Sequence, residues 1–282
     1  MHLCEEELSA RIGASTLYLI YAKEPFEAIE QEITTEREEK PELWEVVDSE
    51  HHALDKMRIK RLKELVSVGY KLSLHCPYDR WINIADREPS RRKQSIKRIK
   101  ESIDAAAELE AVFFTLHPGA YRGFIEDNRK MSLLNADAIA GLCDYADSRG
   151  IVLSVENMPP NLDYFLVTPQ EFLDIEEQSS LELKITFDAG HANLAGLIDE
   201  FLKTLGQRIF EVHVHDNRGG LDEHLEVGLG SIDWLKIVKE FCSRGKIVYY
   251  IAETYKPPFK SVAWLKEKTA AFEKMFRFTR GI

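Results

Sequence analysis

The sequence predicts a closed (β/α)8 barrel, formed as one domain by residues 1–282. Short apolar runs alternate with amphipathic stretches at an even pace, which gives eight β-α units in one chain. The apolar runs are rich in Val, Ile, Leu and Phe, as a parallel sheet covered by helices requires. The chain also has the length that such barrels need. Because no low-complexity linker or shift in composition interrupts the pattern, we expect a single domain.

The eight expected strands are Arg11–Leu19, Glu42–Val47, Lys71–His75, Val112–His117, Ile151–Glu156, Leu183–Asp188, Ile209–Val214 and Ile247–Glu253. A helical pattern follows each of them, at Phe26–Thr35, Leu54–Val68, Ser90–Leu109, Met131–Arg149, Pro169–Gln178, Leu197–Leu205, Ile232–Arg244 and Ser261–Phe276. Leu54, Met57 and Leu62 illustrate the apolar stripe of a helix that packs on a sheet. Several helices stop just before a glycine, such as Gly69 or Gly150, as helix ends commonly do. The order of elements is that of a β/α barrel throughout.

An open, doubly wound sheet is the alternative architecture for alternating strands and helices. That fold normally has a glycine-rich, phosphate-binding turn after its first strand. The corresponding segment here, IGASTLYLIYAKE, contains no such turn. The closed barrel is therefore the prediction.

The composition predicts a cytoplasmic protein. Apolar residues make up 44% of the chain and charged residues 30%, and no apolar run approaches the ~20 residues that cross a bilayer. The first ten residues are acidic and lack the features of a signal peptide. Cys4, Cys76, Cys143 and Cys242 are scattered, which is typical of reduced thiols rather than of a disulfide framework. We expect no membrane association, and no obligate protein partner is evident.

The net charge of −11 argues against a general nucleic-acid coat, because binding to phosphates needs a basic surface. A local basic groove is still compatible with this charge. An acidic protein can also attract divalent cations into a cleft that is rich in carboxylates. The charge therefore favours a small substrate or a metal over a long nucleic acid.

Six successive strands of the predicted barrel finish on a histidine or an acidic residue, which points to a metal site. In β/α barrels the active site lies at the carboxyl ends of the strands, so these side chains converge. Burying them without partners is costly, and a multivalent cation bound by carboxylates and neutral imidazoles removes that cost. The set comprises His75, His117, Glu156, Asp188 with His191, His213 with the loop residues Asp222 and His224, and Glu253.

Three other histidines have plainer interpretations. His215 alternates with His213 along a strand, so its side chain is expected to start toward the opposite face, in a supporting or packing role. His51 and His52 follow the second strand, where they could line the rim, although exposure to solvent is the favoured interpretation.

The strand ends also resemble a known superfamily. Glu156 in SVEN, Asp188 in FDAGH, His213 in VHVHD and Glu253 in AET match the four metal ligands of the xylose isomerase-like barrels, which include sugar and sugar-phosphate isomerases and epimerases. The resemblance extends over almost the whole chain. By this likeness, one divalent ion binds the four residues.

Five further positions resemble endonuclease IV, also called AP endonuclease family 2. They are His75 in LHCP, His117 in LHPG, His191 in DAGH, and Asp222 with His224 in DEH. The resemblance implies one ion on His75, His117 and Glu156, a second on Glu156, Asp188, His213 and Glu253, and a third on His191, Asp222 and His224. Zinc is the ion that this resemblance implies, in up to three copies.

The two likenesses imply different reactions. A multinuclear site implies hydrolysis of a phosphodiester, either in DNA beside an abasic site or in a smaller phosphoester. The alternative is an isomerase or epimerase of a small sugar or sugar phosphate, in which Glu156 and Glu253 form an acid/base pair, His191 holds a substrate oxygen, and manganese or cobalt could replace zinc. The chain departs from the endonuclease pattern at DAGH, in place of a DTCH-type motif, and at HVHDN, in place of HLND.

Several rim residues are candidates for binding substrate. Tyr78 and Trp81, in a loop with many basic residues, could stack on nucleic acid, although a solvated helix start with two rim aromatics is the plainer interpretation. Asn157 and Arg218 are the other candidates, and Arg218 could meet a phosphate. Weaker phosphate candidates are Arg122 and Lys256.

Overall fold

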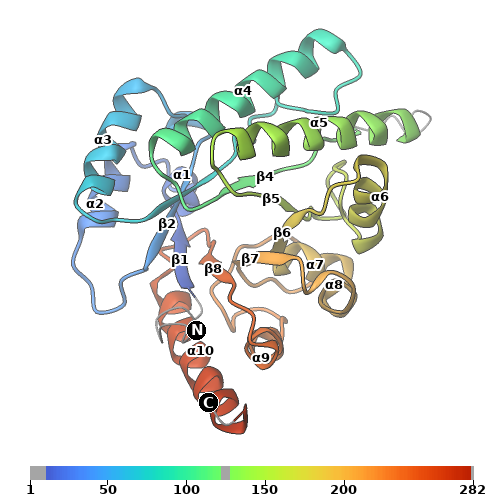
Figure 1. Ribbon diagram of the computed structural model, residues 1–282. Coiled ribbons are helices and arrows are strands. Elements are labelled where there is room, and N and C mark those ends of the chain that lie inside the picture. The colour runs from blue at the N-terminus through green and yellow to red at the C-terminus, as the bar shows by residue number, and fades with distance from the viewer. Residues whose placement is uncertain (1–10, 122–127, 281–282) are drawn as a thin grey trace.

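The chain forms a closed barrel of eight parallel strands that pair in sequence order (Figure 1). The computed structural model describes residues 11–121 and 128–280. The strands are β1 (Arg11–Ser15), β2 (Leu43–Val47), β3 (Leu72–His75), β4 (Phe114–Leu116), β5 (Leu153–Glu156), β6 (Lys184–Asp188), β7 (Ile209–Val214) and β8 (Tyr249–Ala252). The prediction of a (β/α)8 barrel is confirmed.

Helices surround the barrel on its outer side (Figure 1). They are α1 (Leu17–Tyr21), α2 (Glu27–Thr34), α3 (Lys56–Ser67), α4 (Pro89–Glu108), α5 (Asn128–Ser148), α6 (Pro169–Ser179), α7 (Ala189–Ala195), α8 (Ile198–Leu205), α9 (Trp234–Arg244) and α10 (Phe259–Arg280), with a 3-10 turn η2 (Glu50–His52). Their boundaries follow local signals. Thr168 and Glu171 form a capping box at the start of α6, and Gly245 adopts a left-handed conformation at the end of α9.

The first predicted strand was too long, because the chain leaves the sheet at Ser15 rather than at Leu19. Two hydroxyl groups end the strand. The side chain of Thr16 accepts a hydrogen bond from the amide of Val47 (3.0 Å), and that of Ser15 accepts one from the amide of Leu17 (3.3 Å). The apolar residues that follow therefore form α1, which lies on the rim.

Helix α7 was not predicted either, because its residues were interpreted as the end of a strand. Asp188 is the last residue of β6 and also caps α7, since its Oδ1 accepts a hydrogen bond from the amide of His191 at 2.6 Å. The turn from strand to helix therefore holds Asp188 and His191 in a fixed relation.

Strand register brings the polar strand ends to one rim. His75 pairs with Val47 of β2, and Asp188 pairs with His213 of β7. His117 and Glu253 follow directly after β4 and β8. The side chains expected to form a metal site therefore lie at the carboxyl ends of the strands, where β/α barrels place their active sites.

The other general expectations concern membranes and thiols. Within residues 11–121 and 128–280, no helix has both the length and the apolar character that crossing a membrane requires. Cys76, Cys143 and Cys242 have free thiols, and Cys4 lies outside the described residues.

Asp48, directly after β2, ties the rim loop before α3 to helix α4. Its buried carboxylate accepts hydrogen bonds from the amide of Leu54 (2.6 Å), from Ser102 Oγ (2.6 Å) and from both terminal nitrogens of Arg98 (2.5 and 2.9 Å). Because both partners are largely withdrawn from water, this ion pair is expected to matter for stability.

We predict that Asp48→Ala lowers the free energy of unfolding by about 3–5 kcal/mol, because it leaves the Arg98 guanidinium buried without its partner. Urea denaturation of the metal-free protein measures this loss. Asp55→Ala is the control, because Asp55 is an exposed N-cap whose loss costs about 0.5–2 kcal/mol. Equal losses for the two variants would contradict the assignment.

Candidate metal centre

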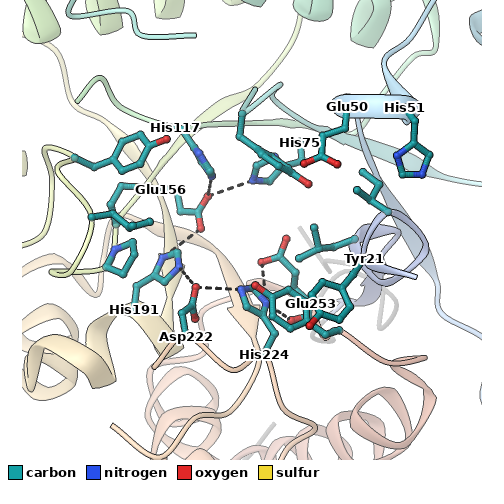
Figure 2. A pocket seen from close by; sticks show the side chains of 18 of the residues that line it. Tyr21, Glu50, His51, His75, His117, Glu156, His191, Asp222, His224 and Glu253 are labelled. Atoms are coloured by element: carbon teal, nitrogen blue, oxygen red, sulfur yellow. Dashed lines mark hydrogen bonds and ion pairs between the residues drawn. The ribbon is translucent and has the colours of Figure 1, made fainter. Parts of the chain in front are cut away.

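Nine side chains expected to bind metal lie together at the rim, in three clusters of which the first two share Glu156. Figure 2 shows those that line the cavity, among them His75, Glu156 and His224. In each cluster the potential ligand atoms lie within 4.8 Å of one another. The first contains His75, His117 and Glu156; the second contains Glu156, Asp188, His213 and Glu253; the third contains His191, His215, Asp222 and His224. The structure therefore brings together every residue that the sequence placed in the set, and it adds His215.

Glu156, at the end of β5, joins the first two clusters. Its Oε2 lies 2.9 Å from His117 Nε2 and 3.3 Å from His75 Nε2. Its Oε1 lies on the other side, 3.2 Å from His213 Nδ1. A carboxylate with one oxygen in each cluster can bridge two cations.

The second cluster lies deepest in the barrel. Asp188 and His213 are fully buried, and Glu156 and Glu253 are nearly so. His213 Nδ1 lies 3.4 Å from Glu253 Oε2 and 3.8 Å from Asp188 Oδ2. One imidazole nitrogen thus faces three carboxylates, an arrangement that a divalent cation would neutralise.

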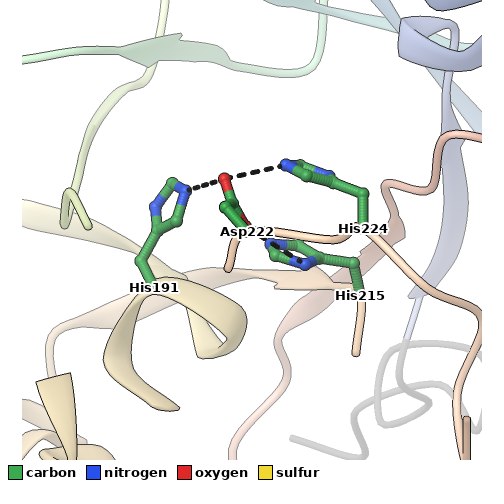
Figure 3. Close-up of side chains that lie close together, drawn as sticks. All are labelled: His191, His215, Asp222 and His224. Carbon is green, nitrogen blue, oxygen red and sulfur yellow. Dashed lines mark hydrogen bonds and ion pairs between the residues drawn. The ribbon is translucent and has the colours of Figure 1, made fainter. Parts of the chain in front are cut away.

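The third cluster surrounds Asp222, in the loop after β7 (Figure 3). Asp222 Oδ2 lies 3.2 Å from Nε2 of His191 and 3.2 Å from Nε2 of His224. His215 stacks on His224, with ring centroids 3.8 Å apart, and its Nδ1 lies 3.8 Å from Asp222 Oδ1.

The expectation that His215 would point away from the site was wrong. Strand β7 ends at Val214, so the alternation of side chains no longer applies at His215. Its Nε2 lies 3.0 Å from both oxygens of Asp188, and Nδ1 has no other hydrogen-bond partner among the described residues. His215 therefore contacts a ligand of the second cluster and turns a free nitrogen toward the third.

The glycine of the DAGH motif, Gly190, leaves space for the ring of His215. A Cβ atom at this position would lie 2.0 Å from Cε1 of His215, so only glycine leaves room for the ring. The backbone around it is held as well, since Asn217 Nδ2 donates a hydrogen bond to the Gly190 carbonyl (2.9 Å).

Three of the histidines are already oriented by the backbone. Nδ1 of His75, His191 and His224 lies 2.8–2.9 Å from the carbonyl of Cys76, Asn157 and Glu253 respectively. A carbonyl only accepts, so Nδ1 is the donor and Nε2 is the nitrogen turned to the clusters. Second contacts of this kind fix the orientation of metal-binding histidines.

Burial and neighbouring charges act together on the pKa values of the side chains in the centre. Burial opposes the charge on His75, but the carboxylates of Glu156, Glu45 and Glu253 outweigh it and raise the pKa of His75 to about 9. The pKa of His191 is likewise raised to about 10, chiefly by Asp188 and Asp222 against burial. The imidazoles in turn hold the pKa of Glu156 well below its ordinary value.

His117 differs from His75, the other histidine of the first cluster. Burial lowers the pKa of His117 despite the nearby carboxylate of Glu156. Its Nδ1 is buried and has no hydrogen-bond partner among the described residues. Its Nε2 faces the cluster, 2.9 Å from Glu156 Oε2, and a neutral imidazole can bind a metal through that nitrogen.

The donor set as a whole fits divalent cations. Imidazole nitrogens and carboxylate oxygens oppose one another across short gaps, and nearly all of them are withdrawn from solvent. Such mixed nitrogen and oxygen donors suit zinc, and also manganese or cobalt. The residues present therefore fit a multinuclear centre.

A cavity of about 790 Å³ opens above the centre (Figure 2). Its size suits a small molecule. Its floor consists of ligands from all three clusters, while its walls are largely apolar or aromatic: Leu17, Ile20, Tyr21, Tyr78, Met158, Pro159, Leu162, Tyr164 and Tyr255. Lys23 is the only lysine or arginine in this lining among the described residues.

The predicted substrate-binding residues divide into two groups. Tyr78 lines the cavity, whereas Trp81, Asn157 and Arg218 do not. Trp81 is 46% exposed, and the exposed Arg218 pairs with Glu223 in its own loop. Asn157 is buried, and its side chain hydrogen-bonds both the amide and the carbonyl of Asp188 (2.8 and 2.9 Å).

Of the two phosphate candidates that remain, only Lys256 is among the described residues. Lys256 is exposed beyond β8 and does not line the cavity, and Arg122 lies outside the described residues. His51 is exposed and lines the rim. His52, expected in solvent, is fully buried, because its Nε2 bonds the carbonyl of Glu24 (2.9 Å) and its ring packs edge-on against Phe26.

Two acidic residues beneath the centre were missed. Glu45 and Glu211 are fully buried, and both lie close to His213. Alternation along FEVHV places Glu211 and His213 on the same face of β7, so the sequence contained a signal for one of them. For Glu45, the signal in the sequence was a single acidic residue within the apolar run LWEVV.

Comparison with known proteins identifies the family. The family model of the xylose isomerase-like TIM barrel matches residues 22–278, so the chain belongs to this family. An uncharacterised protein of Methanocaldococcus jannaschii is 34% identical over 204 residues, which cover 70% of this chain and 69% of that protein. A probable endonuclease 4 of Thermoplasma acidophilum is 25% identical over 174 residues, covering 57% of this chain and 58% of that one.

Solved structures show the same barrel. A D-tagatose 3-epimerase-like protein superposes with a TM-score of 0.82 and 26% identity, covering 95% of this chain and 99% of the other. A Thermus thermophilus protein soaked with zinc chloride shares the fold, with a TM-score of 0.69 and 21% identity over 92% of this chain and 98% of that one. Relatives named as an endonuclease and as an epimerase-like protein thus occur side by side, so the family contains enzymes of different activity.

We predict that Gly190→Ala weakens metal binding at the third cluster about 10–100-fold, because the added methyl group displaces the His215 ring. Zinc titration in competition with a chelator measures the effect. The control is Gly141→Ala in α5, where a methyl group meets nothing within 4 Å and zinc binding should be unchanged. Equal zinc affinities for both variants and the unmodified protein would contradict a role for His215.

A second prediction concerns pH. In the metal-free protein the raised pKa values of His75 (about 9) and His191 (about 10) contribute stability that is complete below the unfolded pKa of about 6.5 and is lost as pH rises through these values. The melting temperature of the chelator-treated protein should therefore fall between pH 7 and 10, while zinc affinity rises because fewer protons compete. Thermal scans with and without zinc test this. A pH-independent gap between the two forms would contradict it.

Proposed function

We propose that this protein is a divalent-metal-dependent hydrolase of small phosphoesters, with up to three ions held by the three clusters. The observation behind this proposal is the sharing of Glu156 between two clusters, beside a third cluster around Asp222. Sugar epimerisation would need only the second cluster. Hydrolysis of a phosphoester is the reaction that makes use of several adjacent cations.

Each of the three clusters would hold one ion. His75, His117 and Glu156 would hold one ion, Glu156 with Asp188, His213 and Glu253 a second, and His191, His215, Asp222 and His224 a third. When bound, the ions supply Lewis-acid stabilisation of charge on the phosphoryl oxygens and lower the pKa of water. Zinc is favoured, because the donors include six imidazoles.

Around this centre, the side chains would orient the substrate and limit access of water. Glu253 and His191 border the cavity, and the Glu253 oxygen that holds no ion would accept or return a proton at the reacting oxygens, while His191 would remain a ligand. Leu17, Ile20 and Leu162 form apolar parts of the wall, which strengthens electrostatic interactions at the floor.

The cavity favours a small substrate over DNA. A duplex is held largely by contacts from lysine and arginine to phosphates. Lys23 alone supplies such a charge among the described lining residues, and the chain has a net charge of −11. A compact phosphoester with an apolar or aromatic group fits these walls better.

A second candidate is epimerisation of a small sugar. It is favoured by the likeness to the D-tagatose 3-epimerase-like structure and by the placement of Glu156 and Glu253, which approach His213 Nδ1 at 3.2 and 3.4 Å. Two carboxylates beside one ion could act as an acid/base pair on opposite faces of the carbon that is inverted. This reaction has no need of the first and third clusters.

Metal content and a single substitution separate the two functions. We predict about three zinc ions per chain by mass spectrometry of the metal-loaded protein, and hydrolysis of bis(p-nitrophenyl) phosphate that a chelator abolishes. His117→Ala should remove one ion and lower hydrolysis at least about 100-fold. Arg218→Ala is the control, because this side chain lies outside the cavity.

Two other outcomes would each support a different function. One ion per chain, together with ketose epimerisation that survives His117→Ala, would support the epimerase instead. Cleavage of duplex DNA at an abasic site, assayed in parallel, would show that the substrate is a nucleic acid.

A further inference from the structure

A layer of polar side chains lies inside the barrel, directly beneath the second cluster. It consists of Glu45 from β2, Thr115 from β4, Ser154 from β5, Thr186 from β6 and Glu211 from β7, all fully buried. Barrel interiors are usually filled by branched apolar residues. Two carboxyl groups at this depth therefore require a reason.

Both carboxyl groups have one oxygen near a threonine hydroxyl and one oxygen without a hydrogen bond. Glu211 Oε2 accepts hydrogen bonds from Thr115 and Thr186 (both 2.8 Å), and Glu45 Oε2 lies 3.1 Å from the same Thr115 Oγ1. Oε1 of both residues makes no hydrogen bond with any described group. His213 Nε2 lies 3.5 Å from Glu45 Oε1 and 3.3 Å from Glu211 Oε1, and this nitrogen also makes no hydrogen bond with a described group.

His213 differs from three of the other ligand histidines in how its outer nitrogen is held. His75, His191 and His224 turn Nε2 to the clusters and donate from Nδ1 to a backbone carbonyl. His213 turns Nδ1 to the cluster, so its outer nitrogen is Nε2, and no carbonyl lies within hydrogen-bond distance there in the described structure. The acceptors available to that nitrogen are the two carboxylates.

We propose that Glu45 and Glu211 are positioning residues that hold the N–H of His213 on Nε2 and keep Nδ1 as the lone pair facing Glu156, Asp188 and Glu253. A neutral imidazole has one N–H, so the side that offers acceptors selects the tautomer. The inference rests on the proposed metal centre. It extends that centre by a supporting layer on strands β2 and β7, which β1 and β8 separate in the barrel.

A cation in the lower layer is the competing explanation, since Glu45, Glu211 and His213 offer ligand atoms within 4.8 Å. That site would have three donors, and His213 would have to bind metal through both ring nitrogens. The apolar side chains of Leu43, Phe113 and Ile251 form a buried cluster of their own in the barrel and add no further donor. An N–H on His213 Nε2, directed between the two Oε1 atoms at 3.5 and 3.3 Å, makes no such demands.

The test compares zinc affinity in variants of the full chain that keep side-chain length. Glu45→Met and Glu211→Met remove the acceptors, and the double variant should bind zinc at the second cluster about 10–100-fold more weakly in competition with a chelator. Gln at both positions keeps an acceptor oxygen and should restore most of the affinity. Ser73→Ala, which alters the residue paired with Glu45 in the strand register, is the control and should change nothing.

A second measurement depends on no variant. In the zinc-loaded unmodified protein, 15N NMR of labelled histidine should show His213 protonated on Nε2 and coordinated through Nδ1. Coordination through Nε2, a fourth zinc ion per chain, or unchanged affinity in a folded double Met variant would overturn the inference. If the unmodified protein binds no zinc, the proposed metal centre itself fails, which is a different result.

Discussion

The centre depends on one buried carboxylate, that of Glu156. Its removal from water is costly, and the surrounding imidazoles offset the cost by facing it from both sides. β5 ends at this residue, and its two oxygens face two neighbouring clusters rather than one.

Much of the centre is organised before any ion binds. Backbone carbonyls orient three histidines, and Asn157 and the α7 amide hold Asp188. Ligands that are held in this way lose little conformational freedom on binding, which strengthens binding and preserves geometry during a reaction. Without a bound cation, the clustered carboxylates raise the pKa values of His75 and His191, which favours their protonated forms.

Family membership limits the chemistry without selecting it. Relatives include a probable endonuclease 4 and a D-tagatose 3-epimerase-like protein, so membership is compatible with more than one reaction. This chain combines the second cluster with two further clusters and with a cavity whose walls are mostly apolar. In the function that we propose, the clusters serve phosphoester chemistry and the walls accommodate a compact substrate.

The barrel and the candidate ligands at its strand ends could be predicted from the residues, because the carboxyl ends of successive parallel strands meet at one rim. Features that depend on where strands stop, and on contacts between distant elements, could be found only in the folded structure. The chain leaves the sheet at Ser15, His215 turns toward the third cluster beyond β7, and Arg218 pairs within its own loop. Glu45 and Glu211 meet beneath His213 from separate strands, a proximity that no local pattern records.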